Sequence, residues 1–262
     1  MAAARAECTK AISLPSTWIA TGVILALHVL IQAANLGPNA DAVAAITPNG
    51  TIEIFAGDPQ PAHRALVGFL VASSFQMGLF LPVLAAVIAG PEFRGRQLGQ
   101  SLLAVPRRGR LVLAKAIAAG GFLALVSALV AAISVGFLYA ATRSWDPGLT
   151  VSADAWLGQA KFLAFAVSSG LVTVALTGLA RSTLLGIVLT LALTALTMTQ
   201  LPAAVSPFLD SLLPLSAGRN LLLDPAANEL SAGPGQALVV LVVWPVAAMT
   251  AAAVALTRRD AR

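Results

Sequence analysis

The side chains best able to do chemistry in this sequence are a few polar groups that interrupt long apolar segments. His28 and Gln32 lie one helical turn apart in the first of these segments, and Gln76 lies in the second. An ionisable or carboxamide group at membrane depth needs a hydrogen-bonding partner or a polar ligand. We therefore treat all three as candidates for a substrate path, the alternative being that His28 only bonds a neighbouring helix.

The sequence lacks the residue combinations that most catalytic and metal sites require. It has no Gly-x-Ser-x-Gly step, its only histidines are His28 and His63, and its only cysteine is Cys8. A nucleophile with its base, or a set of metal ligands, is therefore hard to assemble. The Gly-x-x-x-x-Gly-Lys-Ser/Thr loop that binds nucleotide phosphates is also absent. We predict no catalytic residue, no metal and no cofactor held by this chain.

The segments that carry these residues have the length and composition of membrane spans. The chain has 262 residues, of which 58% are hydrophobic and 10% charged, whereas soluble domains carry about 25% charged residues. A helix that crosses the hydrocarbon core needs about 20 mainly apolar residues. Six segments meet this requirement, so we predict an all-α membrane protein with a single transmembrane domain. The predicted spans are residues 18–34, 65–89, 116–141, 162–180, 183–201 and 237–256.

The basic residues predict the orientation of these spans. With both termini in the cytoplasm, the inner segments hold twelve of the sixteen basic residues, and the outer segments hold only Arg64, Arg143, Lys161 and Arg219. Inner loops of membrane proteins are rich in Lys and Arg, so we predict cytoplasmic termini. A net charge of +5 could suggest nucleic acid, but this loop clustering argues against that partner. An alternative is that residues 18–34 are a cleaved signal peptide, which would leave five spans.

Two of the predicted outer segments contain signals for local structure. Residues 46–55 place turn formers between β-prone flanks, which is typical of a small hairpin. Residues 201–237 alternate Pro and Gly with apolar clusters, so we expect short helices at the outer interface and no further span.

The cytoplasmic segment from Gly90 to Lys115 is the most informative part of the chain. Pro91 and Glu92 suit the first turn of a helix, and Pro106 would end it. Apolar residues between them fall on one broad face, so we predict a short amphipathic helix between the second and third spans. A simpler alternative is that the basic residues of this segment only anchor the third span to anionic headgroups.

This segment resembles the loop after the second span in permeases of the ABC-2 type transporter family. The resemblance rests on Glu92-Phe-Arg-Gly-Arg96, on Leu102-Leu-Ala-Val-Pro106-Arg-Arg108, and on Lys115 at the start of a helix. The number of spans, the chain length and the broken outer segment before the last span also fit. One step departs from the family pattern, because Arg96-Gln97 stands where the family has Gly-Thr.

The resemblance implies a coupling helix that docks in a groove of a separate ATPase subunit. Polar side chains of the helix would contact the ATPase, apolar ones would pack against it, Pro106 would fix the corner, and Arg107 and Lys115 would hold the third span at headgroup level. The residues to which it assigns these roles are Glu92, Phe93, Arg94, Arg96, Leu98, Leu102, Pro106, Arg107 and Lys115.

The family also implies the partners. Two copies of an ABC ATPase would bind ATP and Mg, and a second permease copy would complete a homodimer in the cytoplasmic membrane of a bacterium. An apolar lumen with few charges suits a hydrophobic or amphiphilic substrate such as a drug or antibiotic. An ATP-independent secondary transporter, a channel, or a scaffold or immunity protein remains the alternative, although no carboxylate falls within a predicted span for proton coupling.

Overall fold

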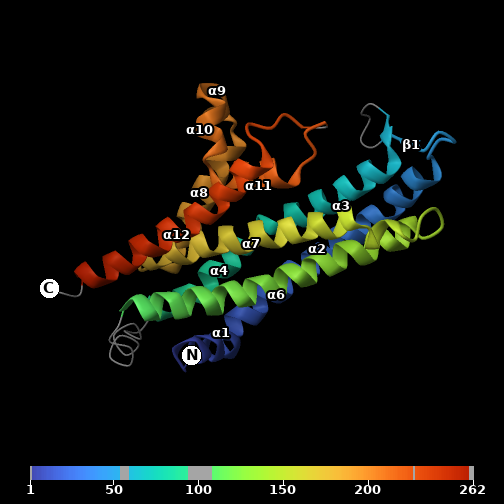
Figure 1. Ribbon diagram of the computed structural model, residues 1–262. Helices are drawn as coiled ribbons and strands as arrows, with labels where there is room; N and C mark the ends of the chain where they lie inside the picture. Colours follow the sequence, from blue (N-terminus) through green and yellow to red (C-terminus); the bar gives the residue numbers. More distant parts are fainter. Residues whose placement is uncertain (1, 54–58, 94–107, 227, 260–262) are drawn as a thin grey trace.

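The computed structural model describes residues 2–53, 59–93, 108–226 and 228–259, and within them the chain is almost entirely helical. The long helices run side by side as an elongated bundle, and both chain termini lie at the same end of it (Figure 1). The helices are α1 (Ala2–Ser13), α2 (Pro15–Ala44), α3 (Ala62–Gly78), α4 (Leu81–Ala89), α6 (Arg108–Thr142), α7 (Ala153–Ala180), α8 (Thr183–Met198), α9 (Leu201–Val205), α10 (Pro207–Ser211), α11 (Pro214–Leu222) and α12 (Pro234–Arg259).

Local sequence signals explain several helix ends. Ser152 and Ser182 cap α7 and α8, because their side-chain oxygens accept hydrogen bonds from the amides of Ala155 and Leu185. Arg181 adopts a left-handed conformation with φ of 51° and so separates these two helices. The predicted tight connection between the fourth and fifth apolar segments is therefore confirmed.

Five helical stretches of the described chain are long and apolar enough to cross a membrane. They are Pro15–Ala44, Ala62–Phe93, Gly109–Thr142, Ala153–Ala180 and Pro234–Arg258. Each contains one of the predicted spans, so this is a helical, multi-pass membrane protein. The remaining predicted span, residues 183–201, is the 16-residue helix α8. It ends early because Gln200 takes a left-handed conformation with φ of 58°.

The surface of the bundle agrees with lipid as its surroundings. Large apolar side chains stand exposed along the long helices, including Ile19 at 67%, Leu184 at 69% and Val242 at 61% exposure. Water would disfavour such continuous apolar surface, whereas lipid does not.

The core lies where α7 meets α3, α4, α6, α11 and α12. Phe162 is fully buried, and the rings of Phe75 and Phe165 meet edge to face with centroids 4.9 Å apart. Gly218 on α11 is required for this packing, since a Cβ there would lie 2.5 Å from the Phe165 ring.

The second span is broken in the middle. The chain leaves α3 at Gly78 and re-enters a helix at Leu81, where Pro82 occupies the first turn and has no amide to donate. Gly78 packs on Phe162, so that a Cβ would lie 2.9 Å from its ring. After Ala89 the chain tightens into the 3-10 turn η1 (Gly90–Phe93).

The segments predicted to lie outside differ from their predictions in detail. α2 continues to Ala44 despite Pro38. Of the predicted hairpin over residues 46–55, the structure describes residues 46–53: Thr47 and Thr51 bond each other across a turn, whereas the strand partner of β1 (Thr51–Ile52) is β2 (Gln60–Pro61), and residues 54–55 lie outside the described residues. A second 3-10 turn, η2 (Leu149–Val151), precedes α7. The predicted short helices after residue 201 are confirmed as α9, α10 and α11.

Candidate functional site

A buried ion cluster lies at the end of the bundle that carries both termini. The carboxylate of Glu92, only 1% exposed, pairs with the ammonium groups of both Lys10 and Lys115. The Nζ atom of Lys115 also lies 2.9 Å from Oε2 of Glu7. Among the described residues, two carboxylates thus meet two ammonium groups.

Three segments far apart in the chain meet in this cluster. Lys10 and Glu7 come from α1, Glu92 from η1, and Lys115 from the first turns of α6. A carboxylate removed from water is tolerated only when cations and hydrogen bonds compensate its lost hydration. The cluster therefore holds α1 against the start of α6 and the end of the second span.

These contacts define the surroundings of the predicted coupling segment. Glu92 and Lys115, to which the sequence resemblance assigns contacts with an ATPase and with headgroups, bond each other inside the protein. Phe93 ends η1 and is partly buried. The other predicted coupling residues, and with them the predicted helix, lie outside the described residues. These are Arg94, Arg96, Leu98, Leu102, Pro106 and Arg107.

The candidate path residues do not gather in one place. His28 is 1% exposed and its Nε2 lies 2.9 Å from Oγ of Ser134 and 3.2 Å from the carbonyl oxygen of Val130. Gln32 is buried on the same face of α2. Gln76, by contrast, is exposed on α3. The first pair thus faces α6, while Gln76 faces the surroundings of the bundle.

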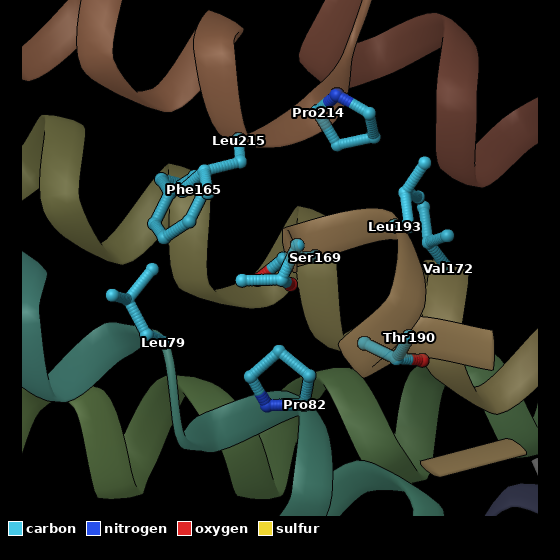
Figure 2. Close-up of a pocket in the computed structure, with 10 residues that line it drawn as sticks. Leu79, Pro82, Phe165, Ser169, Val172, Thr190, Leu193, Pro214 and Leu215 are labelled. Carbon is cyan, nitrogen blue, oxygen red and sulfur yellow. The ribbon is translucent and has the colours of Figure 1, made fainter. Parts of the chain in front are cut away.

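A small cavity lies beside the break in the second span. Its volume is about 30 Å³, which is room for water but for no larger ligand. Figure 2 shows Ser169 of α7 and Thr190 of α8 among apolar side chains such as Phe165 and Leu215. This cavity is too small to serve as a substrate site in the described conformation.

A larger cleft lies at the end of the bundle opposite the termini, with a volume of about 530 Å³. It is lined by the first turns of α3 and α7 and by the end of α11 with the residues that follow it. At its edge Arg64 makes a bidentate pair with Asp224, with Nε to Oδ2 and Nη2 to Oδ1 both at 2.5 Å. The Arg64 guanidinium lowers the pKa of the Asp224 carboxyl below its ordinary value.

Sequence reasoning missed several members of both sites. Lys10 was counted only among the basic residues of the inner segments, and Glu7 and Asp224 were not singled out. These three residues lie 82 to 160 residues along the chain from the partners that they bond. No local motif links residues at such separations, so only the packing of the helices could reveal them.

Within the part of the chain that the structure describes, no three side chains of the metal-binding types come together. The two sites thus offer ion pairing, hydrogen bonding and apolar surface. Comparison of the sequence with protein families and with individually characterised proteins finds no match.

Proposed function

We propose that this chain is the permease subunit of an ATP-driven exporter that moves a hydrophobic or amphiphilic substrate out of the cytoplasm. The observation that supports this function best is the ion cluster of Glu7, Lys10, Glu92 and Lys115. It lies where the chain enters and leaves the segment that resembles a coupling helix.

The cluster suits the transmission of a force. Residues 94–107 begin after Phe93, the neighbour of Glu92, and end shortly before Lys115. Because these two side chains bond each other, a partner that displaces this segment displaces α4 and α6 together. Lys10 and Glu7 add α1 to the same unit. Breaking such a buried cluster costs several kcal/mol, so the unit moves as a whole.

The exposed Gln76 supports a second permease copy. Its position is close to the middle of the stretch Ala62–Phe93. A carboxamide that faces lipid there lacks hydrogen-bonding partners, and helix association supplies them. We infer a homodimer in which this face of α3 meets the partner copy.

The energy source belongs to another chain. Because the sequence has no phosphate-binding loop, ATP and Mg would be bound by two copies of an ABC ATPase. Each would receive residues 94–107 of one permease, with both termini of the permease on the cytoplasmic side of a bacterial plasma membrane.

The test measures ATP hydrolysis by the purified complex of permease and ATPase. We would co-express the chain with the ATPase encoded beside it and purify through a tag on the permease. The double variant Arg94→Ala, Arg96→Ala alters the coupling segment and keeps all four side chains of the cluster, Glu7, Lys10, Glu92 and Lys115. Arg143→Ala, at the opposite end of the bundle, is the matched control.

We expect the ATPase to co-purify with the wild type and with Arg143→Ala, and its substrate-stimulated hydrolysis to fall several-fold in the double variant. If no ATPase is retained in mild detergent, or the double variant hydrolyses ATP as the wild type does, the proposal is wrong. A channel, a secondary transporter or a scaffold would then account better for the chain.

A further inference from the structure

The cleft opposite the termini combines an apolar floor with a charged rim. Val67 and Val71 of α3 and Leu221 and Leu222 of α11 provide the floor. Its volume of about 530 Å³ lies within the range of roughly 300 to 1,000 Å³ typical of small-molecule sites. The cleft can therefore hold one molecule with an apolar body.

The charges on the rim are not equivalent. Arg64 and Asp224 satisfy each other through their bidentate pair. Asp154 lies in the first turn of α7, where the positive end of the helix dipole favours its charge. Lys161 is partly buried and makes no ion pair with any residue that the structure describes. The cleft thus presents one ammonium group that takes part in none of the ion pairs among the described residues.

The placement of this lysine is unusual for the chain. Only four of the sixteen basic residues fall in the predicted outer segments, and two of them, Arg64 and Lys161, line this one cleft. Lys161 lies on α7 directly before the predicted span 162–180 and is partly buried where it lines the cleft. A partly buried ammonium group is stabilised by an anionic or hydrogen-bonding partner.

We propose that the cleft binds an amphiphile with a single anionic headgroup, such as a phosphate or carboxylate, on an apolar chain. The Lys161 ammonium group pairs with the headgroup, and the valine and leucine floor covers the chain. This inference names the substrate class of the proposed exporter and rests on that function. Asp154, about two helical turns away along α7, repels an anionic headgroup, so its charge limits the affinity of the cleft for such a ligand.

The test uses the purified chain in nanodiscs of zwitterionic lipid, without any ATPase. Binding of dodecyl phosphate would be measured by isothermal titration, with uncharged dodecanol as the reference ligand. The variants are Lys161→Met, which keeps the apolar stem and removes the charge, Asp154→Asn, and the matched control Arg143→Met, which removes an exposed cation at the same end of the bundle.

We expect Lys161→Met to weaken binding of dodecyl phosphate by about tenfold or more, the size of a lost charge-assisted hydrogen bond. Asp154→Asn should bind it at least as tightly as the wild type, and Arg143→Met should bind it equally well. Dodecanol should bind weakly to all four proteins. Equal affinity of wild type and Lys161→Met, or an equal loss in Arg143→Met, would overturn the inference.

A second set of nanodiscs identifies the source of the headgroup. If anionic phospholipid added to the bilayer competes with dodecyl phosphate in the wild type, the natural occupant is a bilayer lipid. If it does not compete, the occupant is a free amphiphile, and either result supports the site. Because no ATPase is present, a failure here leaves the coupling proposal standing, and a failure of coupling leaves this binding measurement intact.

Discussion

The Nε2 atom of His28 lies 2.9 Å from the hydroxyl oxygen of Ser134, a residue 106 positions further along the chain. Ser134 in turn accepts a hydrogen bond of 2.9 Å from Ser74. A buried chain of three polar side chains thus joins α2, α6 and α3 in apolar surroundings, where each hydrogen bond is stronger than in water. This arrangement favours a structural role for His28 over contact with substrate.

Replacing Ser134 tests this role. Ser134→Ala leaves His28 and Ser74 without their shared partner, and we expect a loss of about 1 to 3 kcal/mol in unfolding free energy. Ser127→Ala is the matched control, because Ser127 is equally buried on α6 but bonds only the Leu123 carbonyl of its own helix. Thermal unfolding in detergent measures both. Equal destabilisation by the two variants would show that the network adds nothing beyond local packing.

The ion cluster predicts strong coupling between substitutions. Glu92→Gln leaves two lysines facing one carboxylate, and we expect it to destabilise the fold by about 3 to 5 kcal/mol. Lys10→Met should destabilise the fold less than Glu92→Gln does, because Lys115 remains beside Glu92. The double variant Glu92→Gln, Lys10→Met should lose less unfolding free energy than the two single variants lose together, because it removes one charge of each sign. Strict additivity in a double-mutant cycle would contradict a direct interaction.

The close packing of α3 and α7 predicts that one added methyl group destabilises the protein. A Cβ at Gly158 of α7 would overlap the side chain of Val71 on α3. We expect Gly158→Ala to lower the unfolding free energy by about 1 to 3 kcal/mol through overpacking. Gly121→Ala on α6 is the control, because open space surrounds that position and alanine favours the helix. A stabilised Gly158→Ala protein would mean that α3 and α7 are not in this contact.

The pair between Arg64 and Asp224 predicts a pH dependence. The folded pKa of Asp224 lies below the 3.8 of an unperturbed aspartate, so the pair contributes stability at higher pH. The contribution is lost as the pH falls below 3.8 and passes through the folded pKa. We expect Asp224→Asn to melt below the wild type at pH 7, and the two melting temperatures to converge in strong acid. A constant difference at all pH values would assign the effect to packing.

The single cysteine offers a direct test of orientation. Cys8 lies on α1 and is partly exposed. We expect a membrane-impermeant maleimide to label it in inside-out vesicles and not in intact cells. In a Cys8→Ser background, Ser206→Cys at the start of α10 should show the opposite pattern. Labelling of Cys8 from outside the cell would reverse the predicted topology.

The sequence predicted the long helices because their signal is local. Five apolar stretches of sufficient length coincide with five long helices, and the helices extend beyond the predicted ends where a residue expected to break them, such as Pro38, stays helical. The early end of α8 at Met198 depends on the left-handed conformation of Gln200, which the conformational preferences of glutamine do not predict. The break at Leu79 had a signal that the span prediction did not use, because Pro82 lies inside residues 65–89 and favours the start of a new helix.

The site residues were harder to predict for a physical reason. Glu92 and Lys115 were singled out through a short motif, but their pairing with each other and with α1 depends on how three helices pack. The same holds for Lys161, which counted only as an exception to the distribution of positive charge. The sequence therefore pointed to several side chains of the two sites, but it did not predict which residues they contact.

The ion cluster also constrains the order in which the protein can assemble. Translation delivers α1 first, then η1, and Lys115 only after the intervening segment has left the ribosome. Until that moment the ion pairs of Lys115 with Glu92 and with Glu7 cannot form, although Glu92 can already meet Lys10. The arrival of α6 completes the set, so the N-terminal helix can settle into its final position only after the third long helix has entered the bilayer.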